Sequence, residues 1–405
     1  MTIEVRRTTA DDIPATVRNA EVAFGFSEDT ESDINPFQEV FAERDGFAAV
    51  DGSSIVGTAA AFDQHVTLPG GTSVSCPGVT MITVLPSHRR RGVLRSMMGE
   101  LLDSMRDRSE PITGLTASEG SIYGRFGFGR ATESRRVTLL THRVVWHDEA
   151  PEIGDVRVVG LDELSKIAPQ LHEARRAQTP GMMSRTSRMW DRIMSDPAAD
   201  RDGASRLFAA VHRSPDGADD GMIAWRVTSD WGSETAPNEV RVRGLSSADP
   251  AVELALWRFA SQMDLVGKVT AVRPMAEALD HALVEPRAVR TTGTFDQNWL
   301  RILDPVAVFG RREYHRDGRF VIGFADPFLD DLTGHYSVEV DSGGAVVRRT
   351  TDAADFTADA AEWASIMVGN ADPRAIAVAG RGRGDAAAAA EFFRTSQLPW
   401  NDVDY

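Results

Sequence analysis

One segment of the chain constrains its fold more than any other, because it runs from an apolar strand through an arginine-rich turn into a helix. The run 79–84 is rich in β-branched residues and is closed by Pro86, which ends a strand. Beyond the turn, apolar residues recur at the spacing of one helical face: Leu94, Met97, Met98, Leu101, Leu102 and Met105. A strand that passes into an amphipathic helix predicts an α/β unit.

The turn itself has the chemistry of a phosphate site. A helix start exposes unpaired backbone N–H groups at the positive end of the helix dipole, and such a terminus binds pyrophosphate well. Arg89, Arg90 and Arg91 add positive charge, and Gly92 allows the backbone to come close to a ligand. The alternative is a basic patch at the start of an ordinary amphipathic helix, but the strand–arginine–glycine–helix order favours phosphate binding.

Length and charge limit the classes of protein that remain. The chain has 405 residues, which is more than one compact core usually holds, so two or three domains are expected. Its net charge of −16 repels a phosphate backbone, and this disfavours nucleic acid as a partner. An acidic surface instead favours cationic partners such as protonated amines.

Cysteine, histidine and hydropathy set further limits. Cys76 is the single cysteine, which excludes a disulfide framework and leads us to expect a core or loop residue. The histidines are scattered without metal-ligand spacing, so no metal site is expected. The first residues lack the apolar stretch of a signal peptide, and no apolar run approaches the ~20 residues of a membrane span. We therefore expect a cytoplasmic protein without membrane contact, with secretion independent of a signal peptide as the alternative.

The order of expected elements divides the chain into three parts, at residues 1–147, 148–296 and 297–405. The first alternates strands and helices, and Thr9 with Asp12 resembles a capping box. The second follows an acidic linker and mixes strands and helices without an arginine-rich loop. In the third we expect a hairpin at Asp341–Gly344, a helix over Phe356–Val368 and a flexible loop at Gly380–Gly384. The tail ends in aromatic residues, which indicates that it is packed against the protein.

Two motifs carry a resemblance to a known family. The string 88–95, HRRRGVLR, is similar to the acetyl-CoA loop of GNAT acetyltransferases, and 117–129, ASEGSIYGRFGFG, resembles the matching segment of the enhanced intracellular survival (Eis) family. The resemblance covers the whole chain. It implies an α/β (α+β) fold with tandem GNAT domains, the second degenerate, followed by a C-terminal domain similar to sterol carrier proteins. It also implies an acetyl-CoA-dependent N-acetyltransferase that assembles as a homo-hexamer of two trimers.

The same resemblance assigns site residues. Acetyl-CoA would be held by Ile82, Thr83, Val84, Arg89, Arg90, Gly92, Val93, Leu94, Ser118 and Glu119. The acceptor would contact Phe26, Glu28, Met81 and Asp404. Ser118 could equally be a plain helix cap, and the acids near Glu28 could equally be solvated surface groups.

The chemistry of acetyl transfer requires a base and an acid. An alkyl amine has a pKa near ~10 and must lose a proton before it attacks a thioester, and the departing thiolate benefits from a proton donor. By resemblance, Tyr123 is the general acid and the main-chain carboxylate of Tyr405 is the general base, with no covalent enzyme intermediate. Each aromatic could instead serve only for packing.

The expected acceptors are primary amines of small polycationic molecules, similar to aminoglycosides, or lysine side chains of peptides. The competing interpretation is a non-catalytic sensor that binds acyl-CoA or lipid. Turnover of acetyl-CoA with any amine would separate the two.

Overall fold

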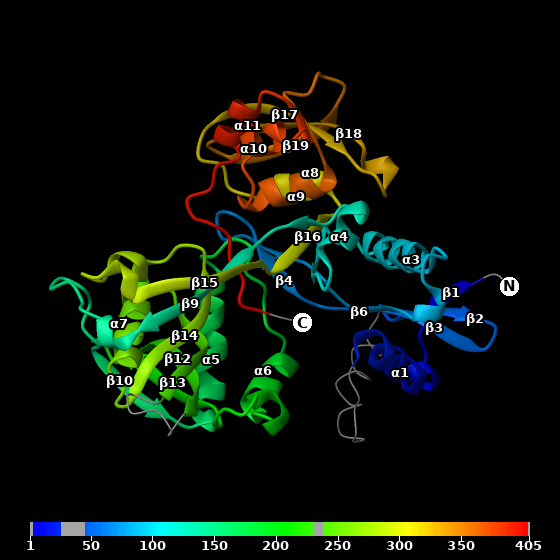
Figure 1. Ribbon diagram of the computed structural model, residues 1–405. Coiled ribbons are helices and arrows are strands. Elements are labelled where there is room, and N and C mark those ends of the chain that lie inside the picture. Colours follow the sequence, from blue (N-terminus) through cyan, green and yellow to red (C-terminus); the bar gives the residue numbers. More distant parts are fainter. Residues whose placement is uncertain (1–2, 26–44, 230–237, 404–405) are drawn as a thin grey trace.

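The computed structural model describes residues 3–25, 45–229 and 238–403, which form three sheets with their flanking helices (Figure 1). The first sheet contains, in spatial order, β1 (Glu4–Arg7), β2 (Phe47–Asp51), β3 (Ser54–Phe62), β6 (Gly78–Val84), β7 (Ile112–Thr116), β16 (Asn298–Ile302) and β8 (Gly129–Arg130). Its helices are α1 (Ile13–Phe24), α3 (Val93–Asp107) and α4 (Gly120–Tyr123), and a separate hairpin consists of β4 (His65–Thr67) and β5 (Ser73–Ser75).

The second sheet, like the first, contains both parallel and antiparallel strand pairs. Its spatial order is β10 (Asp155–Val159), β11 (Phe208–Arg213), β12 (Asp219–Ser229), β13 (Asn238–Ser247), β14 (Val266–Pro274), β9 (Glu133–Leu140) and β15 (Val289–Asp296). The helices of this part are α5 (Leu161–Arg176), α6 (Ser187–Ser195) and α7 (Pro250–Ser261).

The third sheet runs β19 (Gly344–Thr350), β18 (Gly334–Asp341), β17 (Gly318–Ala325), β20 (Phe356–Asp359) and β21 (Gly382–Gly384). Helices α8 (Pro305–Phe309), α9 (Ala360–Val368), α10 (Pro373–Val378) and α11 (Ala386–Phe392) accompany it. Helix α9 packs so closely on the first sheet that a Cβ at Gly129 of β8 would collide with the carbonyl of Ala361. The third part therefore rests directly on the first (Figure 1).

The first and second sheets exchange strands. The chain passes from β8 in the first sheet to β9 in the second within residues 130–133, and it returns from β15 to β16 within residues 296–298. Strand β16 pairs with β7 from Ile302–Ile112 to Asn298–Thr116, so the first sheet contains a strand that follows the whole second sheet in the sequence. Because of this exchange, no single position in the sequence separates the first sheet from the second. The expected domain limits 1–147, 148–296 and 297–405 stay a prediction.

Several local expectations are confirmed. The Thr9 amide donates to the Asp12 carboxylate over 2.7 Å, as the capping box requires. The hairpin at Asp341–Gly344 joins β18 to β19. Cys76 is fully buried in the core.

Two local expectations are wrong. The helix predicted over Phe356–Val368 begins only at Ala360, because residues 356–359 pair in parallel with β17 and Asp359 then caps the helix through the Glu362 amide. The glycine-rich stretch Gly380–Gly384, predicted as a flexible loop, contains strand β21, which pairs with β20 from Ala358–Gly382 to Phe356–Gly384. In both cases a neighbouring strand supplies backbone partners that the local sequence does not reveal.

None of the helices in the described part of the chain combines the length and apolarity that a membrane crossing requires.

Candidate active site

The candidate site lies where two parallel strands diverge. Strands β6 and β7 pair only at Gly78–Gly114 and Val79–Leu115, and beyond these residues they separate. Two cavities open along the divergence, a larger one of about 850 Å³ and a smaller one of about 250 Å³. The larger extends to the start of α3, and the smaller lies between the middle of β6 and the end of β7.

A bulge in β6 opens its backbone towards these cavities. The pairing with β3 passes from Thr58–Thr83 directly to Ala60–Thr80, so Met81 and Ile82 bulge out of the ladder. Met81 adopts a φ of 52°, which a non-glycine residue rarely takes. Strain of this kind persists only where surrounding contacts hold it, and it concentrates at functional sites.

Side-chain hydrogen bonds hold the bulged strand in place. The buried Thr83 hydroxyl donates to Asn19 Oδ1 of α1 over 2.6 Å and lies 2.6 Å from the Thr58 hydroxyl. Thr58 also donates to the Met81 carbonyl over 2.8 Å. The Thr83 side chain therefore ties β6 to α1 and β3.

The start of α3 forms one wall of the larger cavity. The first intrahelical bond runs from the Ser96 amide to the Gly92 carbonyl, so the amides of residues 93–95 precede it. Gly92 takes a φ of 82°, yet a Cβ there would meet nothing within 4 Å. The glycine is therefore required by backbone conformation and not by crowding.

The arginine run divides into two groups. Arg89 and Arg90 line the larger cavity, together with Arg95 from the first turn of α3. Arg91 points elsewhere, because its Nη2 lies 3.3 Å from Asp51 Oδ2 at the end of β2. The positive charge at the cavity thus comes from the first two arginines of the run, from Arg95 and from Arg125.

Tyr123 stands at the junction of the two cavities and lines both. Its side chain is buried and packs edge-on against Phe128, with ring centroids 6.2 Å apart. Burial raises the pKa of the Tyr123 phenol, while a hydrogen bond with Ser118 opposes that rise. The phenol is therefore held in its protonated form at neutral pH.

The structure brings most of the predicted site residues together. All ten residues expected to hold the cofactor line the larger cavity, and Met81 lines the smaller one. Phe26, Glu28, Asp404 and Tyr405 lie outside the described residues. Arg95 and Arg125 also line the larger cavity, although the sequence did not lead us to assign them to the site. The available signal was that they lie within the two motifs at 88–95 and 117–129.

The C-terminal segment is packed, as its aromatic residues indicated. Trp400, Asn401 and Val403 are buried, and Val403 belongs to the same continuous apolar core as Tyr123. Among the residues that the structure describes, no cluster of three or more His, Cys, Asp or Glu side chains could hold a metal ion.

Diverging parallel strands, a glycine at the following helix start and a cavity lined by arginines define a GNAT-type acyltransferase site. Models of the acetyltransferase (GNAT) domain match residues 4–131 and 181–302, and a sterol carrier protein domain model matches residues 305–402.

Relatives and solved structures agree with this class. The chain is 31% identical to N-acetyltransferase Eis of Mycobacterium tuberculosis, across 94% of this chain and 93% of that protein. It is 35% identical to an uncharacterized N-acetyltransferase of Streptomyces avermitilis, across 87% of this chain and 86% of that one. The crystal structure of Eis1 from Mycobacterium abscessus superposes with a TM-score of 0.88 at 25% identity, each chain fully covered. A GCN5-related N-acetyltransferase from Anabaena variabilis, 17% identical over both full chains with a TM-score of 0.86, shares the fold.

The chain belongs to the Eis family of GNAT N-acetyltransferases, with two GNAT domains followed by a sterol carrier protein domain. GNAT acetyltransferases use acetyl-CoA as cosubstrate, and the arginine-lined cavity beside β6 fits a ligand with a pyrophosphate group.

Proposed function

We propose that this enzyme transfers the acetyl group of acetyl-CoA to primary amines of small polycationic molecules or of lysine side chains. The observation that carries the proposal is the position of Tyr123, whose buried phenol borders both the arginine-lined cavity and the smaller cavity beside Met81. A proton donor at that junction can serve a reaction between ligands bound on its two sides.

Acetyl-CoA supplies the acetyl group as a thioester. The carboxylate of Tyr405 takes one proton from the acceptor's ammonium group, and the freed nitrogen forms a C–N bond to the acetyl carbon while the C–S bond breaks. Tyr123 protonates the departing sulfur and recovers a proton from the new amide nitrogen through solvent. The products are one amide, one thiol and one released proton.

The acceptor class follows from charge. The chain has a net charge of −16, so a polycationic amine is attracted to it and an anionic acceptor is repelled. Phe26, Glu28, Met81 and Asp404 are the proposed acceptor contacts. We further propose that the enzyme acts in the cytoplasm as a hexamer of two trimers.

The test is release of free thiol from acetyl-CoA with a panel of aminoglycosides, polyamines and lysine peptides. Tyr123→Phe should lower kcat by about 10²-fold or more, as expected for loss of a general acid. Tyr336→Phe is the matched control, because the Tyr336 hydroxyl is also buried but bonds to the Leu332 carbonyl in the third domain, away from both cavities. A Tyr123→Phe enzyme with wild-type kcat would refute the acid, and CoA binding without turnover on any amine would favour a sensor.

A further inference from the structure

The second GNAT domain has the same strand–helix frame that holds the cavity of the first. Strands β13 and β14 pair in parallel from Asn238–Val266 to Arg241–Thr270 and then diverge, as β6 and β7 do. Helix α7 begins at Pro250, three residues after β13 ends, in the position that α3 has after β6. A cleft between the diverging strands is therefore present in both domains.

In the second domain a buried arginine bridges the two diverging strands. Arg273 of β14 is 1% exposed, and its Nη1 donates to the Leu245 carbonyl of β13 over 3.0 Å. Its Nη2 donates to Glu253 of α7 over 2.6 Å, and its Nε donates to Glu277 over 2.9 Å. The guanidinium thus spans the divergence and occupies the backbone acceptor on β13.

The helix start in this domain also disfavours an anion. Asp249 caps α7 by accepting from the Ala251 amide over 2.8 Å, and Glu253 lies in its first turn. These carboxylates stand where α3 has arginines and a glycine. A pyrophosphate group would be repelled here.

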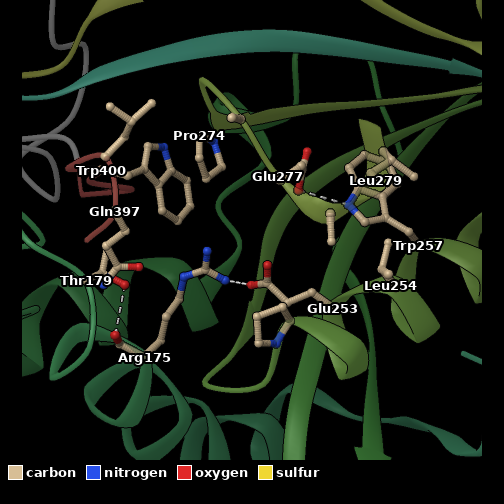
Figure 2. Close-up of a pocket in the computed structure, with 14 residues that line it drawn as sticks. Arg175, Thr179, Glu253, Leu254, Trp257, Pro274, Glu277, Leu279, Gln397 and Trp400 are labelled. Atoms are coloured by element: carbon tan, nitrogen blue, oxygen red, sulfur yellow. Dashed lines mark hydrogen bonds and ion pairs between the residues drawn. The ribbon is translucent and has the colours of Figure 1, made fainter. Parts of the chain in front are cut away.

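The C-terminal segment covers one side of the cleft, where Trp400, Arg175, Glu253 and Pro274 line a remaining pocket of about 350 Å³. The Trp400 ring lies 4.7 Å from the guanidinium carbon of Arg175 and 5.3 Å from that of Arg273, and Trp400 is 2% exposed. Its Nε1 donates to the hydroxyl of Ser134 on β9 over 3.0 Å. Figure 2 shows the ring beside Pro274 and close to the ion pair of Arg175 with Glu253. A buried indole in contact with two guanidinium groups is a strong anchor.

The residues after Trp400 extend this attachment. Asn401 Oδ1 accepts from the Met183 amide over 3.0 Å, and the Asp402 carbonyl accepts from Arg185 over 3.0 Å. The Asp402 carboxylate lies 3.1 Å from Arg185 and 3.7 Å from His172. Burial works to raise the pKa of Asp402, but the positive charges around it outweigh burial and hold that pKa below its usual value.

We propose that the cofactor cleft of the second GNAT domain serves as a receptor for the chain's own C-terminal segment, with Trp400 as the positioning residue for the terminal carboxylate. The inference rests on the proposed role of Tyr405 as the base. Three extended residues span at most ~11 Å, so an anchor at Asp402 restricts the volume that the last carboxylate can sample. Holding a base within reach of its proton converts a rare encounter into a local one.

The experiment combines hydrogen exchange with steady-state kinetics on the full chain. In Trp400→Ala the backbone amides of segment 397–403 should exchange at least about tenfold faster, because their anchor is lost. Its kcat should fall at least about tenfold while KM for acetyl-CoA stays unchanged, because the first cavity is untouched. Trp400→Phe, which retains an aromatic ring beside Arg175 and Arg273, should recover most of both properties.

Leu398→Ala is the matched control, since Leu398 is in the same segment but 56% exposed, and it should behave as wild type. If Trp400→Ala fails to fold, Ser134→Ala gives the same comparison with a smaller effect, because it removes only the bond to Nε1. If the amide hydrogens of segment 397–403 exchange at the wild-type rate in Trp400→Ala, the cleft is not a receptor for the C-terminal segment. A loss of kcat with an equal rise in KM for acetyl-CoA would also overturn the proposal.

A chain that ends at Val403 separates this inference from the proposed base. That chain keeps Trp400 and lacks Tyr405, so it should retain slow tail exchange and lose kcat. Full turnover by it would refute Tyr405 as the base, and the receptor would then be judged by hydrogen exchange alone.

Discussion

Arg301 of β16 and Asp326 at the end of β17 form an ion pair in which both side chains are fully buried. The pair joins the first sheet to the sterol carrier protein domain. Asp326 also accepts from the amides of Phe328 and Leu329, which positions its carboxylate towards the arginine. The link between these two domains is therefore both apolar and ionic.

Breaking this pair should destabilise the protein strongly. Arg301→Met leaves the Asp326 charge buried without its partner, which is expected to cost about 3–5 kcal/mol in the free energy of unfolding. Asp352→Ala is the control. Its side chain is 55% exposed and that of its ion-pair partner Arg319 is 46% exposed, so this pair should contribute less than about 1 kcal/mol. Denaturant unfolding measures both variants, and similar losses in the two would contradict the argument.

Gly92 should matter for cofactor binding through its backbone. Gly92→Ala meets no steric obstacle but must hold a φ of 82°, so the turn should relax and KM for acetyl-CoA should rise several-fold. Gly99→Ala, in the same helix and also free of steric contacts, should leave KM unchanged and raise stability by about 0.5–1 kcal/mol. Equal KM values for the two variants would show that the left-handed conformation at Gly92 has no role.

The arginines at 89–91 should differ in how much they contribute to acetyl-CoA binding, because only some of them line the larger cavity. Arg90→Ala removes a charge that lines the larger cavity, and the loss of a charge-assisted hydrogen bond corresponds to about a 10- to 100-fold weaker affinity for acetyl-CoA. Arg91→Ala removes only the contact with Asp51 and should change affinity less than about threefold. Calorimetric titration with acetyl-CoA distinguishes them. It should also report one site per chain, because carboxylates stand at the start of α7 where α3 has arginines. Two sites per chain would contradict this difference between the two domains.

The pH dependence of kcat should show the raised pKa of Tyr123. A general acid must be protonated, so activity is present below its pKa and lost as the pH rises through it. Burial raises that pKa above the ordinary phenol value of ~10, so the alkaline loss of kcat should be centred above pH ~10. The Tyr123→Phe enzyme should retain its residual rate across the same range. An alkaline limb that persists in Tyr123→Phe belongs to another group.

Much of the candidate site could be predicted from sequence, because its parts are local. The divergent strand β6, the turn and helix α3 lie within 78–107, and Tyr123 follows within one more strand and turn. The direction of Arg91 could not be predicted, since its partner Asp51 lies 40 residues earlier in the chain. The strand at Phe356 was mistaken for helix, because its partner Ile322 also lies far away in sequence.

Local features of this protein follow from short stretches of sequence: the capping residues, the hairpin turn, the glycine before α3 and the amphipathic helix after it. Each depends on backbone sterics and side chains within a few residues. The placement of β9 in the second sheet and of β16 in the first, and the contact of Trp400 with Arg273 at the second cleft, depend instead on the packing of the whole chain. Strand partners and buried charges are supplied by segments that are distant along the chain, so no local pattern encodes them.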